Sequence, residues 1–350
     1  MATAIEPLQL NGSHGEGGGA LLRTVLAMSV LTGRPVIVGS VRGGLRNRGL
    51  ASEDMMFLDA LSSTCDADVV GALGDDEVEF YPRRSVRPLR YSFSADAYGS
   101  GTVSACVIAQ ALLPVLARAG GISTLDLRGS THGPNTLAFD AIEVATLESH
   151  RLQGLFATAC LKRAAFFPSV EGHVEIEVEP SVLEPLLWTT RGPLDACGAN
   201  VTVTGSEKEL GGRAADALND LFQGRGLRPE ISISQHREAS LEIQVTCWAR
   251  FENGMGSGTA VGRSRSGVGQ VATQAFEDLM RWYVTDATVD PFLADQLLLP
   301  ACLAEGRTEF STPKVTRRLT TMAWAVRQFM PIRVTVHGTE GGSGRVTIER

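Results

Sequence analysis

The sequence predicts an α/β fold in which helices are layered on β-sheets. Short strand-like runs alternate with apolar helical stretches along most of the chain, and a similar order of elements occurs twice in the first half. The chain has 350 residues, 43% of them apolar, which is enough to bury the core of a large domain and of an insert.

The first series of elements lies between Leu8 and Tyr81 and has the order β-α-β-α-β-β. A glycine-rich segment separates its first strand from an apolar helix. We expect this segment to be a turn, because glycine is favoured where the chain turns sharply. The second helix is amphipathic, with apolar residues at helical spacing. The expected elements are strand 8–10, helix 20–31, strand 35–41, helix 50–63, strand 68–70 and strand 77–81.

A second series with a similar order lies between Leu89 and Val178. The order of elements is repeated, whereas the sequence itself is not. The expected elements are strand 89–93, helix 103–117, strand 122–127, helix 135–147 and strand 174–178.

Residues 184–262 have a different texture, with a compact β-α-β-β pattern. We expect them to form a small inserted α/β domain, and residues 1–183 and 263–350 to form the large domain. The expected elements of the insert are strand 200–204, helix 207–222 and strands 230–234 and 241–246. The large domain is expected to end with helices 263–285, 291–304 and 314–329 and strands 332–337 and 345–348.

The overall charge and the cysteines restrict the function and the compartment. The formal net charge is −7, whereas proteins that follow a nucleic-acid backbone are usually basic, so an RNA partner would be held at its end in a local pocket and DNA is not expected. The six cysteines include no C-x-x-C pair, so most should be buried free thiols. No signal-peptide pattern or membrane-length apolar run is present, and a cytoplasmic location without membrane contact is expected.

The glycine-rich segment 12–19 is the strongest candidate for a ligand site. It joins a strand to a helix, and the free amides and dipole of a helix start suit a phosphate. Glu16 would repel a phosphate unless a divalent cation lay between them, so a solvated glutamate in an ordinary turn is the alternative. The segment matches neither the Walker A pattern nor G-x-G-x-x-G. The expected phosphate contacts are Ser13 and the amides of Gly17, Gly18 and Gly19.

Four segments resemble the RNA 3′-terminal phosphate cyclase family: residues 12–24, 32–35, 293–300 and 329–334. The resemblance implies a large domain of repeated β-α-β-α-β-β units, as in enolpyruvyl transferases, with a smaller insert. It implies ATP-dependent conversion of an RNA 3′-phosphate to a 2′,3′-cyclic phosphate through a histidine that carries AMP. It also implies ATP with Mg²⁺ or Mn²⁺ as cofactors.

The same resemblance assigns the residues of a nucleotide and phosphate site. Glu16 would belong to this site and would also bind a metal ion. Arg42 would bind phosphate, and Asp295 and Gln296 would lie at the nucleotide. The full set is Ser13, Glu16, Gly17, Gly18, Gly19, Arg23, Arg42, Arg46, Phe292, Asp295 and Gln296.

Several positions depart from the family pattern. The nucleophilic histidine of the family falls on Arg318, and a guanidinium stays protonated and has no free lone pair for covalent catalysis. His14, in the glycine-rich segment, is a possible substitute. The second arginine of an Arg-x-x-Arg pair is Leu45, with Arg46 beside it.

Three functions therefore stay open. The first is an ATP-dependent cyclase, an enzyme of the ligase type, whose histidyl-AMP step is in question. The second is a non-catalytic RNA-binding or ribosome-assembly factor, favoured by the missing histidine. The third is an enzyme that activates the phosphate or carboxylate of another small substrate on the same fold, favoured by the negative charge. The expected partner is an RNA 3′-end or another phosphorylated substrate.

Overall fold

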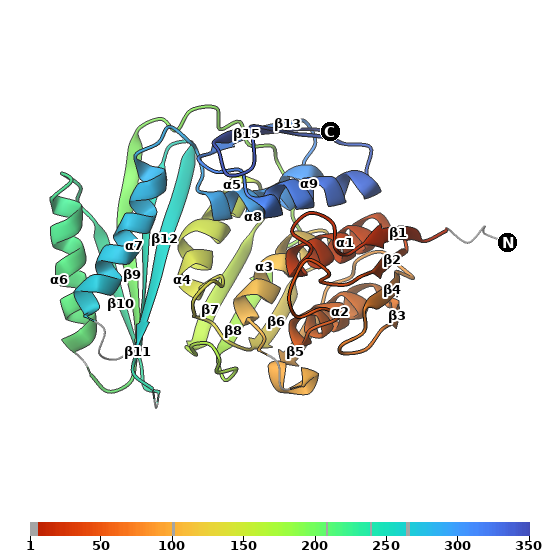
Figure 1. Cartoon of the computed structure of the whole chain (residues 1–350), viewed down its shortest axis with the longest axis horizontal. Coiled ribbons are helices and arrows are strands. Elements are labelled where there is room, and N and C mark those ends of the chain that lie inside the picture. The colour runs from red at the N-terminus through yellow and green to blue at the C-terminus, as the bar shows by residue number, and fades with distance from the viewer. Residues whose placement is uncertain (1–5, 100–101, 208, 239, 264–266) are drawn as a thin grey trace.

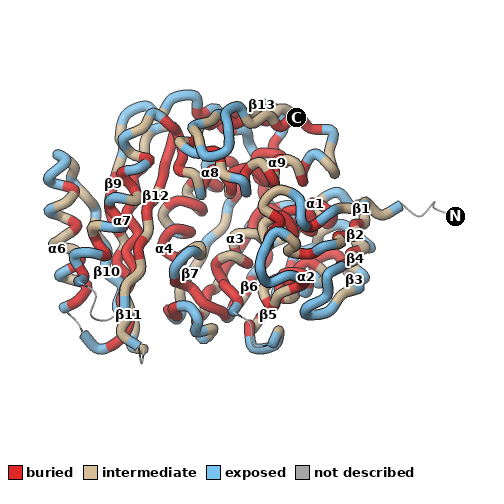
Figure 2. Tube along the Cα trace, viewed as in Figure 1, coloured by how far each residue is buried: buried red, intermediate tan, exposed pale blue. Residues whose placement is uncertain are grey.

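The chain forms three β-sheet units and a separate lobe (Figure 1). The computed structural model describes residues 6–99, 102–207, 209–238, 240–263 and 267–350. Helices of the three units pack against one another, and Figure 2 shows α1, α3 and α8 buried over much of their length. This central helical layer positions the candidate site.

The first unit has the predicted element order and forms a four-stranded sheet with strand order β1-β2-β4-β3. β1 and β2 are parallel and the other neighbours are antiparallel, because α1 provides the crossover that parallel strands require. Its elements are β1 (Leu8–Asn11), α1 (Gly19–Thr32), β2 (Val36–Gly39), α2 (Ser52–Cys65), β3 (Asp68–Val70) and β4 (Glu77–Tyr81).

The second unit repeats this arrangement with strand order β5-β6-β8-β7. Its strand β7 was not predicted, and the helix predicted over 135–147 is wrong in its bounds, since three short helical segments fill 139–152. The middle segment, η2, is a π-helix, which interrupts regular α-helical spacing. The elements are β5 (Arg90–Ser94), η1 (Ala95–Tyr98), α3 (Ala105–Leu116), β6 (Ser123–Arg128), α4 (Phe139–Ala141), η2 (Ile142–Thr146), α5 (Leu147–Leu152), β7 (Ala157–Arg163) and β8 (His173–Val178).

The third unit has the strand order β13-β15-β14. An isolated parallel bridge joins Leu187 to Glu309 of β13, so Leu187 occupies the place that β1 has beside β2 in the first unit. The separate lobe therefore interrupts the third unit after its first strand position. The elements are α8 (Pro291–Leu303), β13 (Arg307–Thr312), α9 (Arg317–Phe329), β14 (Arg333–His337) and β15 (Gly344–Glu349).

The separate lobe has its own hydrophobic core, on the left in Figure 1. Its sheet has the order β10-β9-β11-β12, and α6 and α7 pack on it. The core includes residues of α7, beyond the predicted boundary at residue 262, so the packing favours a lobe that extends to about Ala287. The elements are β9 (Leu194–Thr204), α6 (Glu209–Gln223), β10 (Glu230–His236), β11 (Glu242–Phe251), β12 (Gly254–Arg263) and α7 (Val268–Tyr283).

The cysteines and helices agree with two simpler expectations. All six cysteines are free, and five of them are buried, whereas Cys160 is exposed on β7. Within the described residues, every helix is too short or too polar to cross a bilayer.

Candidate functional site

A cavity of about 830 Å³ lies where the central helices meet the lobe. Glu16 and Gly19 line it from the start of α1, and Asp295 and Gln296 line it from α8. The glycine-rich segment and the 293–300 segment, nearly 280 positions apart in the numbering, therefore share one hollow.

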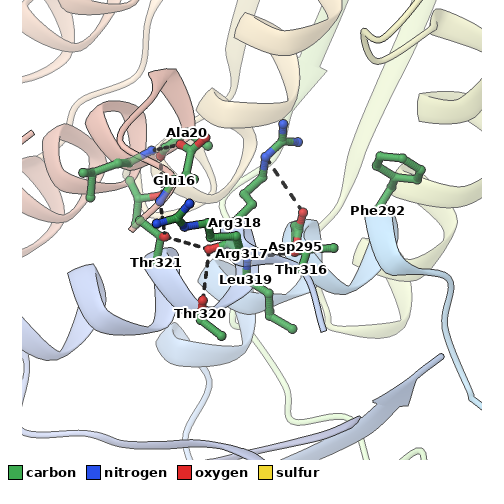
Figure 3. A network of polar contacts seen from close by, with 12 residues as sticks. Glu16, Ala20, Phe292, Asp295, Thr316, Arg317, Arg318, Leu319, Thr320 and Thr321 are labelled. Carbon is green, nitrogen blue, oxygen red and sulfur yellow. Dashed lines mark hydrogen bonds and ion pairs between the residues drawn. The ribbon is translucent and has the colours of Figure 1, made fainter. Parts of the chain in front are cut away.

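The glycine-rich segment is packed tightly between α9 and the loop after β2. Gly15 and Gly17 have φ of +61° and +56°, which is the left-handed region that favours glycine. A Cβ at Gly17 would come within 2.7 Å of the Gly44 nitrogen, so glycine is also required for space. The amide of Glu16 donates a 2.8 Å hydrogen bond to the Thr321 hydroxyl of α9, which fixes the loop to the third unit (Figure 3).

The start of α1 presents amide groups and a cation to the cavity. The Glu16 carboxylate accepts a 3.0 Å hydrogen bond from the amide of Leu21, whereas the amides of Gly19 and Ala20 have no partner among the described residues. A Cβ at Gly19 would lie 2.8 Å from Nη1 of Arg23, so this guanidinium lies beside the helix start. Arg23 also forms a 2.8 Å ion pair with Glu53 of α2. The arrangement suits an anion.

The loop after β2 contributes a second paired arginine. Arg42 forms a 2.8 Å ion pair with Asp54, a fully buried residue that also accepts from the amide of Ala51. Leu45 lines the cavity, whereas its neighbour Arg46 is exposed and does not. Arg46 therefore does not supply the cavity with the positive charge that is missing at Leu45.

The start of α8 contributes buried carboxylates. Asp290 caps the helix by accepting from the amides of Phe292 and Leu293 at 2.7 and 2.9 Å, and burial raises its pKa to about 6. Phe292 is 63% exposed at the rim of the cavity. The Gln296 side chain accepts a 2.6 Å hydrogen bond from the Thr146 hydroxyl.

Asp295 joins α8 to the start of α9. Its Oδ1 accepts a 2.7 Å hydrogen bond from Thr316, the N-cap of α9, and its Oδ2 lies 3.9 Å from Nε of Arg318. Figure 3 shows the Arg318 side chain reaching from the first turn of α9 to Asp295. Arg318 also lines the cavity, so the position to which the resemblance assigns the nucleophile lies in the shared hollow.

None of the described histidines lines this cavity. His14 is stacked on Trp324 with ring centroids 3.8 Å apart, which directs it away from the cavity lining. His132 and His150 are fully buried. His14 is therefore poorly placed to replace a nucleophile at position 318.

The sequence model described as RNA 3′-terminal phosphate cyclase matches residues 14–336. The chain belongs to the RNA 3′-terminal phosphate cyclase family. This confirms the resemblance predicted from the four segments and the α/β fold class.

Full-length relatives agree with the family assignment. The RNA 3′-terminal phosphate cyclase of Methylococcus capsulatus is 33% identical over 346 residues, which cover 97% of this chain and 96% of that protein. The protein of the same name from Thermococcus onnurineus is 31% identical over 97% of this chain and 98% of its own length. Among solved structures, the enolpyruvyl transferase NikO from Streptomyces tendae matches 99% of this chain and 48% of its own, with 12% identity and a TM-score of 0.38.

Within this cavity, acidic residues outnumber basic ones. The lining arginines are Arg23, Arg42 and Arg318, and the lining acids are Glu16, Glu53, Asp278, Asp290 and Asp295. Sequence reasoning did not assign Asp278 or Asp290 to the site. The N-cap position of Asp290 before Pro291 was a usable signal for the start of the helix, although not for its place in the cavity.

The carboxylates fit a hard divalent cation. Glu16 and Asp295 each use one oxygen for a hydrogen bond inside the protein and leave the other without one. Burial is the main cause that raises the pKa of Asp295, and the negative charges of Asp290 and Glu16 add to it, so a cation nearby would stabilise the charged form of this acid. Oxygen donors of this kind are those that Mg²⁺ and Mn²⁺ take.

We expect the Asp295→Asn variant to be more stable than the parent at pH 8. Burial raises the pKa of Asp295 from 3.8 to about 7, so the folded chain binds more protons between these values. The stability linked to the neutral acid is present at low pH and is lost as the pH rises through 7. In metal-free buffer, D295N should gain roughly 2–4 kcal/mol at pH 8 and little at pH 4 in urea unfolding.

The control for this prediction is Asp286→Asn, because Asp286 is exposed. D286N should leave the unfolding free energy nearly unchanged at both pH values. A D295N variant that is destabilised equally at pH 4 and pH 8 would show that the folded protein does not disfavour the ionised form of Asp295.

Proposed function

We propose that this chain binds the 3′-phosphate end of RNA and a nucleotide in the cavity. Because position 318 is an arginine, no histidine at that position carries AMP. The proposal rests on one observation. The cavity joins the free amides at the start of α1 with three arginines, while no described histidine lines it. Phosphate recognition is thus supported, and the nucleophile that the family resemblance implies is not.

The arginine at position 318 favours binding over covalent chemistry. Its guanidinium remains charged at all physiological pH values and cannot attack a phosphorus atom. It can donate charge-assisted hydrogen bonds to a phosphate. Half of its side chain is exposed, so a ligand can reach it.

A nucleotide with Mg²⁺ or Mn²⁺ fits the mixed charge of the cavity. Glu16 and Asp295 would hold the cation, which when bound neutralises phosphate charge. Arg23 and the amides of Gly19 and Ala20 would contact phosphate oxygens. Phe292 at the rim offers an exposed ring on which a base could stack.

Matched RNA oligonucleotides test the proposed function. We expect a short RNA with a 3′-phosphate to bind at least about 10-fold more tightly than the same RNA with a 3′-hydroxyl, because charged hydrogen bonds would be lost. Incubation with ATP and Mg²⁺ or Mn²⁺ should give no cyclic phosphate. Equal binding of the two RNAs would refute the proposed recognition, and a cyclised product would restore the ATP-dependent cyclase as the function.

We expect Arg23→Ala to weaken binding of the 3′-phosphorylated RNA by roughly 10-fold or more. This factor corresponds to the free energy that a hydrogen bond to a charged group usually contributes. Arg46→Ala is the matched control, because Arg46 is exposed outside the cavity. Fluorescence anisotropy at fixed salt measures both. If R46A weakens binding as much as R23A, the phosphate lies outside the cavity or the effect is one of overall charge.

A further inference from the structure

A second group of chemically reactive side chains lies on the sheet of the second unit, apart from the cavity. Asp126 of β6 and His173 and Glu175 of β8 each offer one ligand atom, and these atoms all lie within 4.8 Å of one another. The two strands are antiparallel, with Asp126 opposite Glu175. Side chains alternate along a strand, and the buried Leu125, Val174 and their neighbours face α3, so the three polar residues share the opposite face.

The distances in this cluster match those between ligands of one ion. His173 Nε2 lies 3.0 Å from Asp126 Oδ1 and 4.0 Å from Glu175 Oε1. Ligands bound at about 2.0–2.2 Å to a common metal are separated by roughly 3–4 Å. The separations of the three ligand atoms are therefore compatible with one shared ion.

The direction of the His173 ring supports this interpretation. Although Nε2 is only 3.0 Å from Asp126 Oδ1, the contact lacks hydrogen-bond geometry. Both atoms are shielded from solvent and have no hydrogen-bond partner among the described residues. Unpartnered buried polar atoms are unfavourable, and an ion bound between these two atoms would satisfy both of them.

Two basic side chains border the cluster. Lys162 pairs with the second Glu175 oxygen, Oε2, at 2.9 Å, and Nε of Arg128 is 3.7 Å from Asp126 Oδ1. Both are half exposed, so they can move into solvent without a large penalty. The Lys162 contact also leaves Glu175 Oε1 available.

We propose that Asp126, His173 and Glu175 bind a divalent transition-metal ion such as Zn²⁺ on this face of the sheet. One imidazole and two carboxylates form a donor set that suits Zn²⁺ and disfavours Mg²⁺, which prefers oxygen ligands alone. The site is independent of the proposed RNA-binding cavity.

Calorimetric titration of the full chain with Zn²⁺, after treatment with a chelator and its removal, tests the site. We expect saturable binding that weakens at least about 10-fold in both His173→Ala and Glu175→Gln, since each removes one of three ligands. Glu177→Gln is the matched control, because Glu177 lies two residues along the same strand and face and outside the cluster. It should bind within twofold of the parent.

Two outcomes would overturn the site. The first is the absence of saturable Zn²⁺ binding to the parent chain. The second is an equal affinity in E175Q and E177Q, which would place the ion elsewhere. E175Q is close in shape to the parent residue, so a melting temperature measured without metal separates lost binding from lost folding.

Discussion

An Arg318→His variant should form a covalent AMP adduct that the parent chain does not form. Position 318 lies in the first turn of α9 and lines the cavity beside Asp295. An imidazole there has a lone pair that can attack the α-phosphorus of ATP, with the bond to the β-phosphate broken and pyrophosphate leaving, whereas a guanidinium has none. We expect acid-labile label from α-labelled ATP to exceed the parent background by on the order of 100-fold, since loss of a nucleophile lowers rates by up to about 10⁶.

The geometry around position 318 supports this expectation. The Asp295 carboxylate, 3.9 Å from Nε of Arg318, could accept a hydrogen bond from the N–H of a neutral imidazole and so orient the ring, which leaves the lone pair of the other ring nitrogen free. Arg317→His is the matched control, because Arg317 is on the same helical turn and does not line the cavity. If R318H and R317H are both unlabelled while ATP still binds, the prediction is wrong and Arg318 alone does not account for the absence of AMP transfer.

Removal of Asp54 should destabilise the fold strongly. Asp54 is completely buried, pairs with Arg42 at 2.8 Å and accepts from the amide of Ala51 at the start of α2. The Asp54→Ala variant would leave a mostly buried guanidinium without its partner and remove a helix cap. We expect a loss of about 3 kcal/mol in the free energy of unfolding, measured with urea.

A surface ion pair provides the comparison for Asp54. Asp68 pairs with Arg83, and both side chains are more than half exposed. Asp68→Ala should therefore lower the free energy of unfolding by less than about 1 kcal/mol. Similar losses in D54A and D68A would contradict the structural role given to the buried pair.

The order of elements could be predicted because strand and helix periodicities differ, but strands rich in glycine could not. β12 contains Gly256 and Gly258, which have no side chains to show alternation. Their function is spatial: a Cβ at Gly256 would meet the Trp282 ring at 2.6 Å, and one at Gly258 the Leu279 amide at 2.1 Å. The strand allows α7 to pack closely, a property of the tertiary structure alone.

The boundary of the lobe also depends on long-range pairing. Leu187 takes the first strand position of the third unit through one bridge to Glu309, which no local pattern reveals. The long helical pattern after residue 263 was predicted, but its membership of the lobe was not, since either core could have accepted its apolar face.

The candidate site was predictable in its segments and not in its side-chain directions. The glycine-rich segment and α8 were expected to share a hollow, and both line the cavity. Which of Leu45 and Arg46 faces that cavity depends on the path of the loop, in which Arg42 has φ of +54°. Spacing along the chain does not specify such a turn.

A structure of the parent chain with ATP and Mg²⁺ or Mn²⁺ tests the central claim most directly. We predict that the phosphates lie against the start of α1 between Arg23 and Arg42, that the cation contacts Glu16 or Asp295, and that no bond joins the α-phosphorus to the protein. A nucleotide bound away from this hollow, or AMP attached covalently to the unmodified chain, would contradict the account.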